Sequence, residues 1–293
     1  DKPYGYMLID HANKTVIQGA RGLAVEELLD FATPEQRFDR IEAFIDRLLT
    51  LNPKTTLFLD LEAGDLAVEG WPGDAIRPRT WEDCRTLAAL IAGPNPALRP
   101  EQPYSQAHFD HANRNGDAAS YEAYDTIFID SITVAGRLCF QHSQGQPEAF
   151  SEKTGKPDTR GAYGLHGREM LAWLSQLQHC RSKSIVFVGI LDAKEDDYGR
   201  KEWVAQIEGS KVGRELPGIV DQVITYQELQ ADDGTKYRAL VCTSPNPWSY
   251  PAKDRSGRLN QIEKPHLGEL FAKIMSGQRK DVLTTEIPQT QAA

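Results

Sequence analysis

Three short runs of consecutive apolar residues lie in the middle of the chain, and stretches with helical periodicity separate them. The runs fall within residues 56–62, 124–131 and 184–190. Runs of this length, apolar at nearly every position, are typical of strands in a parallel sheet, which is covered on both faces. Strands that alternate with helices predict βαβ units, so the pattern predicts an α/β fold with a mostly parallel sheet.

Helices are predicted by apolar positions that recur every three or four residues and by start signals before them. Thr33 followed by Pro34 predicts an N-cap and first turn for a helix over residues 34–50. Thr80 and Asp83 form a capping-box-like start for a helix to about residue 91. A third helix is predicted over residues 161–180.

The remaining segments are predicted from turn residues and polarity. A hairpin is expected between residues 4 and 18, and strands 220–226 and 237–243 are expected at the far edge of the sheet. Residues around 108–116 and the charge run 192–197 are predicted as solvated loop and turn. We therefore divide the chain into three parts: an N-terminal hairpin-plus-helix segment, a core and a frayed tail, at residues 1–52, 53–277 and 278–293.

Composition excludes several protein classes. The 293 residues are 40% hydrophobic and 26% charged, as in ordinary globular proteins, and no apolar run is long enough for a membrane span. The net charge of −9 disfavours wholesale wrapping of a polyanion but allows a local basic groove. The chain opens without a secretory signal, which predicts a cytoplasmic protein. Four scattered cysteines without metal-ligand spacing predict buried free thiols.

Carboxylates end two of the predicted strands. Asp60 and Glu62 follow the first run, and Asp130 with Ser131 follows the second. Because parallel strands present their carboxyl ends at one edge of a sheet, Asp60, Glu62 and Asp130 are expected to converge there and to attract a divalent cation such as Mg²⁺. The alternative is that Asp130 and Ser131 simply cap the next helix.

The motif Phe58-Leu59-Asp60-Leu61-Glu62 resembles the second core strand of RecA-like ATPases, whose terminal glutamate polarises the attacking water. The motif Thr126 to Ser131, TIFIDS, resembles their Walker B strand, and Pro251 to Gly257, PAKDRSG, resembles their Lys-x-Arg finger. Together with GKPDTRGAYG, QIEGSKVGRELPGIVDQV and NPWSYPAKDRSGRL, these motifs are similar to phage and prophage ATP-binding proteins of the RecA-like class, over about residues 55–275.

The resemblance implies a RecA-like sheet that binds ATP and Mg²⁺ and acts in DNA recombination or single-strand annealing, encoded by a phage or prophage and working in the bacterial cytoplasm. Asp130 with Ser131 would hold Mg²⁺, and Glu62 would orient the attacking water. Lys253 and Arg255 would reach the nucleotide of a neighbouring subunit, which implies a homo-oligomer. Asp60 and Asp192 would lie at the cofactor. The alternative for Lys253 and Arg255 is a solvent-facing turn.

A basic irregular loop lies between residues 150 and 160. It carries Lys153, Lys156 and Arg160, with Phe150 and Tyr163 on its flanks, which suits phosphate contacts and base stacking. The resemblance implies that this region faces single-stranded DNA. A merely solvated loop is the alternative.

One departure from the family is the absence of GxxxxGK[ST] ahead of the first strand, where that loop would cradle phosphate. The nearest glycine cluster, residues 19–23, is followed by Ala24-Val25-Glu26 instead of Gly-Lys-Ser/Thr. A second hypothesis is therefore a non-catalytic scaffold or DNA-binding protein with the same fold. A third is an Mg²⁺-dependent nuclease that uses Asp60, Glu62 and Asp130.

Overall fold

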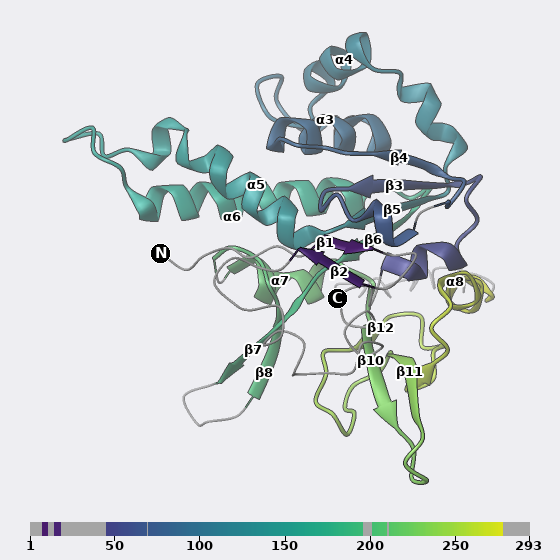
Figure 1. Cartoon of the computed structure of the whole chain (residues 1–293). Helices are drawn as coiled ribbons and strands as arrows, with labels where there is room; N and C mark the ends of the chain where they lie inside the picture. The colour runs from purple at the N-terminus through teal and green to yellow at the C-terminus, as the bar shows by residue number, and fades with distance from the viewer. Residues whose placement is uncertain are drawn as a thin grey trace, which may run out of the picture.

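A four-stranded, wholly parallel sheet forms the centre of the molecule. The computed structural model describes residues 8–10, 15–18, 45–68, 70–195, 201–209 and 211–277. The sheet has the order β4-β3-β5-β6, with bounds β3 Thr56–Asp60, β4 Asp74–Ile76, β5 Thr126–Asp130 and β6 Ser184–Val188. Figure 1 shows helices packed on the sheet, so the predicted α/β fold with a parallel, RecA-like sheet is confirmed.

Helices connect these strands and cover one face of the sheet. This layer consists of α3 Trp81–Ala92, α5 Ile132–Gln144 and α6 Thr159–Gln178, and α4 Gln106–Asn115 packs on α3. Short 3-10 helices are η1 Ile45–Thr50, η2 Asp65–Val68, η3 Ala118–Ala123 and η4 Pro147–Ala149. The predicted capping box of α3 is present: Thr80 accepts from the Asp83 amide, and the Asp83 carboxylate accepts from the Thr80 amide.

Alternate residues of β3 and β5 belong to two separate hydrophobic cores, one on each face of the sheet. Leu57 and Ile127 pack with their strand neighbours against α3, α5 and α6. Phe58 and Phe128 point to the other face, with ring centroids 5.9 Å apart, and pack against η1 and α8, Leu267–Met275. Every residue of β3 and β5 is buried, which explains why both strands are apolar at nearly every position.

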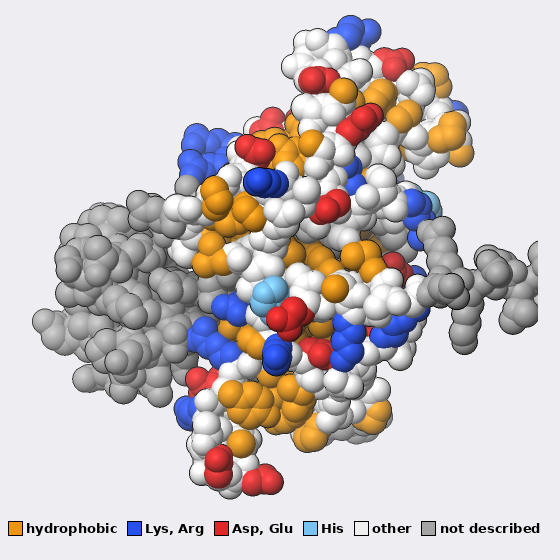
Figure 2. Space-filling view, turned by 90° about the vertical axis from the view of Figure 1, so that its right-hand side faces the viewer, with side chains coloured by type: hydrophobic (Ala, Val, Ile, Leu, Met, Phe, Trp, Pro, Cys, Tyr) orange, Lys and Arg blue, Asp and Glu red, His pale blue; other side chains and the backbone are white. Residues whose placement is uncertain are grey.

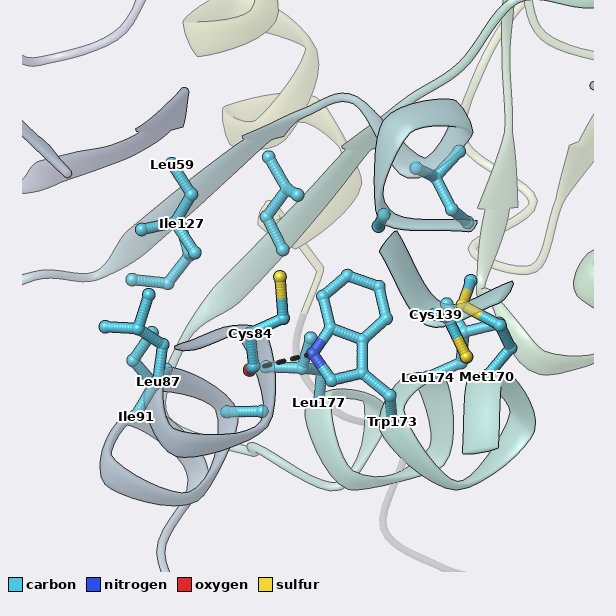
Figure 3. Packing of buried hydrophobic residues seen from close by; sticks show 14 of the residues in the cluster. Leu59, Cys84, Leu87, Ile91, Ile127, Cys139, Met170, Trp173, Leu174 and Leu177 are labelled. Carbon is cyan, nitrogen blue, oxygen red and sulfur yellow. Dashed lines mark hydrogen bonds between the residues drawn. The ribbon is translucent and has the colours of Figure 1, made fainter. Parts of the chain in front are cut away.

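Trp173 of α6 anchors the helical layer to α3. Its indole nitrogen donates to the carbonyl oxygen of Cys84 at 3.1 Å, and its side chain lies among leucines and Met170 (Figure 3). Cys84, Cys139, Cys180 and Cys242 are all free and buried, as the sequence predicted. Burial raises the pKa of the Cys84 thiol to about 12, so this thiol stays protonated at neutral pH.

The C-terminal strands form separate small sheets. Their bounds are β7 Leu191–Glu195, β8 Lys201–Ala205, β9 Gln222–Val223, β10 Thr225–Gln230, β11 Lys236–Val241, β12 Lys253–Asp254 and β13 Ile262–Glu263, with α7 Lys211–Ile219 between β8 and β9. The pairs β7-β8 and β9-β12 are antiparallel ladders, and β10-β11-β13 is an antiparallel sheet.

The predicted placement of strands 220–226 and 237–243 at the edge of the parallel sheet is therefore wrong. The turn at Asp232–Gly234 joins β10 to β11 as a hairpin, with Gly234 at a φ of 85°. A tight turn joins antiparallel strands, and β10 and β11 pair with each other and with β13 and not with a strand of the parallel sheet, so the hairpin lies in its own sheet below β6 in Figure 1.

Two polar segments predicted as loop or turn are regular structure. Residues 106–115 form α4, which Ser105 caps by accepting from the His108 amide at 3.3 Å. Ala112 is the one buried residue of α4, and most of the other residues of this helix are polar, which is why the sequence resembled a loop. The charge run after residue 191 belongs to β7 as far as Glu195, because its backbone pairs with β8.

The predicted N-terminal elements are confirmed only in part. β1 Leu8–Asp10 and β2 Thr15–Gln18 form the expected antiparallel hairpin. Residues 45–50 form a 3-10 helix instead of the last turns of an α-helix, and residues 34–44 of that predicted helix lie outside the described residues. The glycine cluster 19–23 and the predicted tail 278–293 also lie outside them. Among the described helices, none has the length and apolarity required to cross a membrane.

Candidate functional site

The carboxyl edge of the parallel sheet brings the predicted acidic residues together. Asp60 and Asp130 are register partners at the ends of β3 and β5, so they lie side by side at this edge. The Asp130 carbonyl oxygen accepts from the amides of Leu61 and Glu62, at 2.7 and 3.3 Å. These backbone bonds fold the chain after β3 over the end of β5, and Glu62 is carried with it.

Asp130 is a buried carboxyl group among negative charges. Its side chain is only 7% exposed, and the peptide bond that joins it to Ser131 is cis. Burial first, and then the charges of Glu62 and Asp60, raise the Asp130 pKa from 3.8 to about 7. A cation at this carboxylate would relieve the same crowding of negative charge.

Ser131 links the start of α5 to Glu62. Its hydroxyl oxygen accepts from the amide of Val134 at 3.3 Å, which makes it the N-cap of the helix. The same hydroxyl donates to Oε1 of Glu62, whose side chain is otherwise exposed. Ser131 therefore has the capping role that the sequence offered as the alternative, and it also holds a candidate catalytic carboxylate.

Asp60 lies beside Asp130 and is held by two contacts of its own. Its Oδ1 accepts from the Gly64 amide at 2.9 Å, and its Oδ2 accepts from Nε of Arg77 at 3.1 Å. Within the part of the chain that the structure describes, no three His, Cys, Asp or Glu side chains are grouped so that they could hold a metal ion. Both carboxylate oxygens of Asp60 already accept hydrogen bonds, and Asp130, Glu62 and Ser131 supply the other side-chain oxygen atoms at this edge.

An open groove runs along β6 and reaches these residues. It has a volume of about 1940 Å³ and is lined by all of β6, by parts of α7 and α8, and by Glu62, Asp130 and Ser131. Among the described strands, β6 pairs only with β5, and all of its residues are half-buried. Within the described residues the groove therefore gives access to the site from the side of β6, with room for a ligand of nucleotide size.

Lys253 and Arg255 lie on the ladder of β9 and β12. The Lys253 ammonium donates to the carbonyl oxygens of Pro217 and Val220, at 2.6 and 2.8 Å, at the end of α7. The Arg255 guanidinium pairs with Asp221. Both side chains therefore have partners within one molecule.

Asp192, the other predicted cofactor residue, lies in β7 opposite Val204 of β8 and is half-buried. The charged groups that act on Asp130 are Glu62 and Asp60, and Asp192 is not one of them. The structure therefore groups Asp60, Glu62, Asp130 and Ser131, and leaves Asp192 on the β7–β8 hairpin.

The predicted DNA-binding residues lie on an arm formed by α5, η4 and α6, which extends to the left in Figure 1. Lys153, Lys156 and Arg160 are all exposed near its tip. Two backbone bonds close the tip: Ser151 donates to Lys156 at 2.8 Å, and Asp158 donates to Ala149 at 2.6 Å.

Aromatic rings lie on the same arm. Phe140 of α5 and Tyr163 of α6 are stacked, with centroids 4.5 Å apart and planes inclined by 22°. Tyr163 is 41% exposed, as is Phe150 at the tip. The arm thus carries both cations and exposed rings.

Sequence reasoning missed Arg77 and Gly64, which bind Asp60. Arg77 follows β4, a strand of three residues whose first two are exposed. No apolar run in the sequence therefore indicated this strand or the position of Arg77 after it. Gly64 follows Glu62 closely, but only the folded turn shows that its amide returns to Asp60.

Comparison with protein-family models matches residues 45–256 to the family described as an AAA domain, which is well over half of the chain. The match includes Glu62, Asp130, Ser131, Lys253 and Arg255. Neither the curated proteins nor the solved structures gave a match to this chain.

Proposed function

The chain belongs to the AAA domain family, and on that premise we propose that it binds ATP with Mg²⁺ and hydrolyses ATP at the carboxyl edge of its parallel sheet. One observation carries the proposal. Glu62, an exposed carboxylate, is held by the Ser131 hydroxyl directly beside the buried carboxyl group of Asp130.

The residues at this edge fit a magnesium ion. Carboxylate and hydroxyl oxygens are the ligands that Mg²⁺ takes in phosphate-binding sites, usually with water completing its shell. Burial first, and then the charges of Glu62 and Asp60, raise the Asp130 pKa to about 7, and the crowding of negative charge favours a bound cation. When bound, Mg²⁺ would neutralise charge on the β- and γ-phosphates. Asp130 and Ser131 would hold it, and Glu62 would orient a water molecule and accept its proton.

Phosphate binding in this chain is expected to be weak. The 293 residues contain no GxxxxGK[ST] loop, which normally gives several charge-assisted hydrogen bonds of about 1.5 to 3 kcal/mol each. Loss of two or three such bonds moves a dissociation constant from about 1 μM to about 1 mM. The open groove beside β6 leaves space for the nucleotide without such a loop.

Calorimetric titration with ATP and Mg²⁺ up to millimolar concentrations tests the proposal. We expect Asp130→Ala to abolish binding, and Glu62→Gln to retain binding while ATP hydrolysis is lost. Asp110→Asn is the matched control, because Asp110 is an exposed carboxylate on α4, away from the sheet edge. If neither binding nor hydrolysis occurs in the wild-type chain, the ATPase proposal fails and the scaffold hypothesis takes its place.

We further propose that the arm binds single-stranded DNA. Lys153, Lys156 and Arg160 would contact phosphates, and the exposed rings of Phe150 and Tyr163 would stack with bases. Acidic residues also lie on this arm, at Glu148, Glu152 and Asp158, and on the face shown in Figure 2 acidic side chains likewise lie among the Lys and Arg side chains. The combination of cations with exposed rings, and not net positive charge alone, therefore supports the arm as the DNA-binding element.

Fluorescence anisotropy with labelled oligothymidylate tests the arm. Replacement of Lys153, Lys156 and Arg160 by Gln is expected to weaken binding at least about tenfold and to reduce its salt dependence. The control replaces three exposed cations elsewhere, Lys54, Arg99 and Lys236. Equal effects of the two triple variants would refute a specific role of the arm.

Action in recombination or annealing, phage origin and a cytoplasmic location remain predictions from the family resemblance. A homo-oligomer is the corresponding proposal for Lys253 and Arg255, because a finger of this kind serves a neighbouring subunit. To act in this way, Lys253 and Arg255 must give up their contacts with α7 and Asp221 and bind the phosphates of the neighbouring subunit's nucleotide. Sedimentation velocity with and without ATP tests the assembly, and a monomer under both conditions contradicts it.

A further inference from the structure

Asp60 is a fully buried carboxylate whose two oxygens have different partners. Only 1% of its surface is exposed. Oδ1 accepts from the Gly64 amide and Oδ2 from Nε of Arg77, at 2.9 and 3.1 Å. A buried carboxylate is tolerated when it is paired and hydrogen-bonded, and these two contacts meet that requirement.

The contact with Gly64 closes a tight turn over residues 60–64. Ala63 has a φ of 55°, in the left-handed region that a residue with a side chain rarely adopts. This conformation brings the Gly64 amide back to Asp60, four residues earlier. The turn therefore depends on Asp60 as an acceptor.

Glu62 sits in the middle of this turn. Its amide donates to the Asp130 carbonyl oxygen, and its carboxylate accepts from Ser131. Both contacts are made to the end of β5, whereas those of Asp60 tie the turn to itself and to the residue after β4. The position of the Glu62 carboxylate is thus fixed from two sides.

Arg77 is suited to hold the 60–64 turn through its contact with Asp60. It follows β4, which pairs in parallel with β3 so that Leu59 lies opposite Ile76. Its guanidinium is planar and keeps its charge, so a pair with a carboxylate is directional as well as attractive. The Arg77 side chain is 49% exposed, so its replacement leaves no cavity in the core.

We propose that Asp60 and Arg77 are positioning residues, which hold the 60–64 turn so that Glu62 points at the end of β5. The inference rests on the proposed function, because Glu62 is the residue that would orient water there. Asp60 accordingly acts through Glu62 and not as a ligand of the nucleotide or of Mg²⁺.

The closing experiment compares Arg77→Gln and Arg77→Lys with Arg79→Gln. Arg79 is an exposed arginine two residues further along, so the control removes the same charge from the same segment. Two readouts are measured: hydrogen exchange of the amides of Leu61, Glu62 and Gly64, and kcat and KM for ATP.

We expect Arg77→Gln to speed exchange of the Gly64 amide about tenfold or more, without change at the amides of β5. kcat should fall about tenfold while KM stays within about twofold, and Arg77→Lys should recover part of both. Arg79→Gln should match the wild type. Exchange and kcat that are the same in Arg77→Gln and Arg79→Gln would overturn the proposal. If the wild type does not hydrolyse ATP, the proposed function fails, and amide exchange alone still decides whether Arg77 holds the turn.

Discussion

The Ser131 hydroxyl donates to Oε1 of Glu62 while its oxygen accepts from the Val134 amide. One side chain thereby joins the end of β5, the start of α5 and the turn after β3. In the proposed reaction this bond sets the direction of the carboxylate that orients water. Ser131 therefore has a structural and a functional contribution, which mutation can separate.

Replacement of Ser131 by Ala tests that separation. Loss of the N-cap should lower the free energy of unfolding by about 1 kcal/mol, and loss of the bond to Glu62 should lower ATP turnover about tenfold. Ser105→Ala is the matched control, because Ser105 caps α4 in the same way and lies outside the site. Urea denaturation and steady-state hydrolysis are measured for both. A fall in turnover of equal size in the control would assign the effect to stability alone.

The carboxyl group of Asp130 should make stability depend on pH. Its pKa rises from 3.8 to about 7 on folding, so the folded state holds this proton more tightly than the unfolded chain does. The resulting stabilisation is complete below about pH 4 and is lost as the pH rises towards 7. It corresponds to a difference of up to about 4 kcal/mol.

Asp130→Asn isolates this group, because the amide cannot ionise. We expect the variant to gain stability relative to the wild type as the pH rises from 5 to 8, measured by urea denaturation at each pH. Added Mg²⁺ should reduce the difference by stabilising the wild type. Stability curves that run parallel from pH 5 to 8 would contradict the raised pKa.

The strands of the site could be predicted because they are buried on both faces. β3 and β5 are apolar in their central residues, and each ends in an aspartate, Asp60 or Asp130. Glu62 follows Asp60 by two residues, so Glu62 and Asp130 stand out in the sequence. The pattern could not show that Asp60 faces Arg77. That contact joins residues from two strands, and the strand before Arg77 is short and largely exposed.

The same limit applied to α4 and to the C-terminal sheets. The segment from Gln106 to Asn115 is polar at most positions and buries one residue, so it resembled a loop. Apolar runs such as residues 237–243 predict a strand but not its sheet, because that depends on which distant strands pair with it. Local composition predicted the elements, and contacts between distant residues decided their arrangement.

Glu169 should be important for stability rather than for the site. Its Oε2 accepts from the Trp81 indole nitrogen at 3.0 Å and lies 3.7 Å from the guanidinium of Arg85. Glu169→Leu would leave both donors poorly compensated in the helical layer and should lower the free energy of unfolding by about 3 kcal/mol. Glu169→Gln keeps an acceptor for Trp81 and should lose less. Urea denaturation compares the two, and equal losses would show that the bond to Trp81 contributes little.

Gly161 offers a test of the arm that leaves its charges unchanged. A Cβ at this position would lie 1.9 Å from the carbonyl oxygen of Glu148, so Gly161→Ala must push η4 away from α6. Gly164→Ala is the control in the same helix, because its Cβ would meet only the end of the Arg168 side chain, at 3.8 Å. The control should gain about 0.5 to 1 kcal/mol from the better helix propensity of Ala.

We expect Gly161→Ala to weaken binding of oligothymidylate about tenfold while its ATP hydrolysis without DNA stays near the wild-type rate. The reason is that the displaced η4 leads directly into the tip, where Lys153 and Lys156 lie. Anisotropy titrations and hydrolysis assays are made on both glycine variants. Unchanged DNA affinity in Gly161→Ala, together with a measured loss of stability, would show that the geometry of the tip is not used in binding.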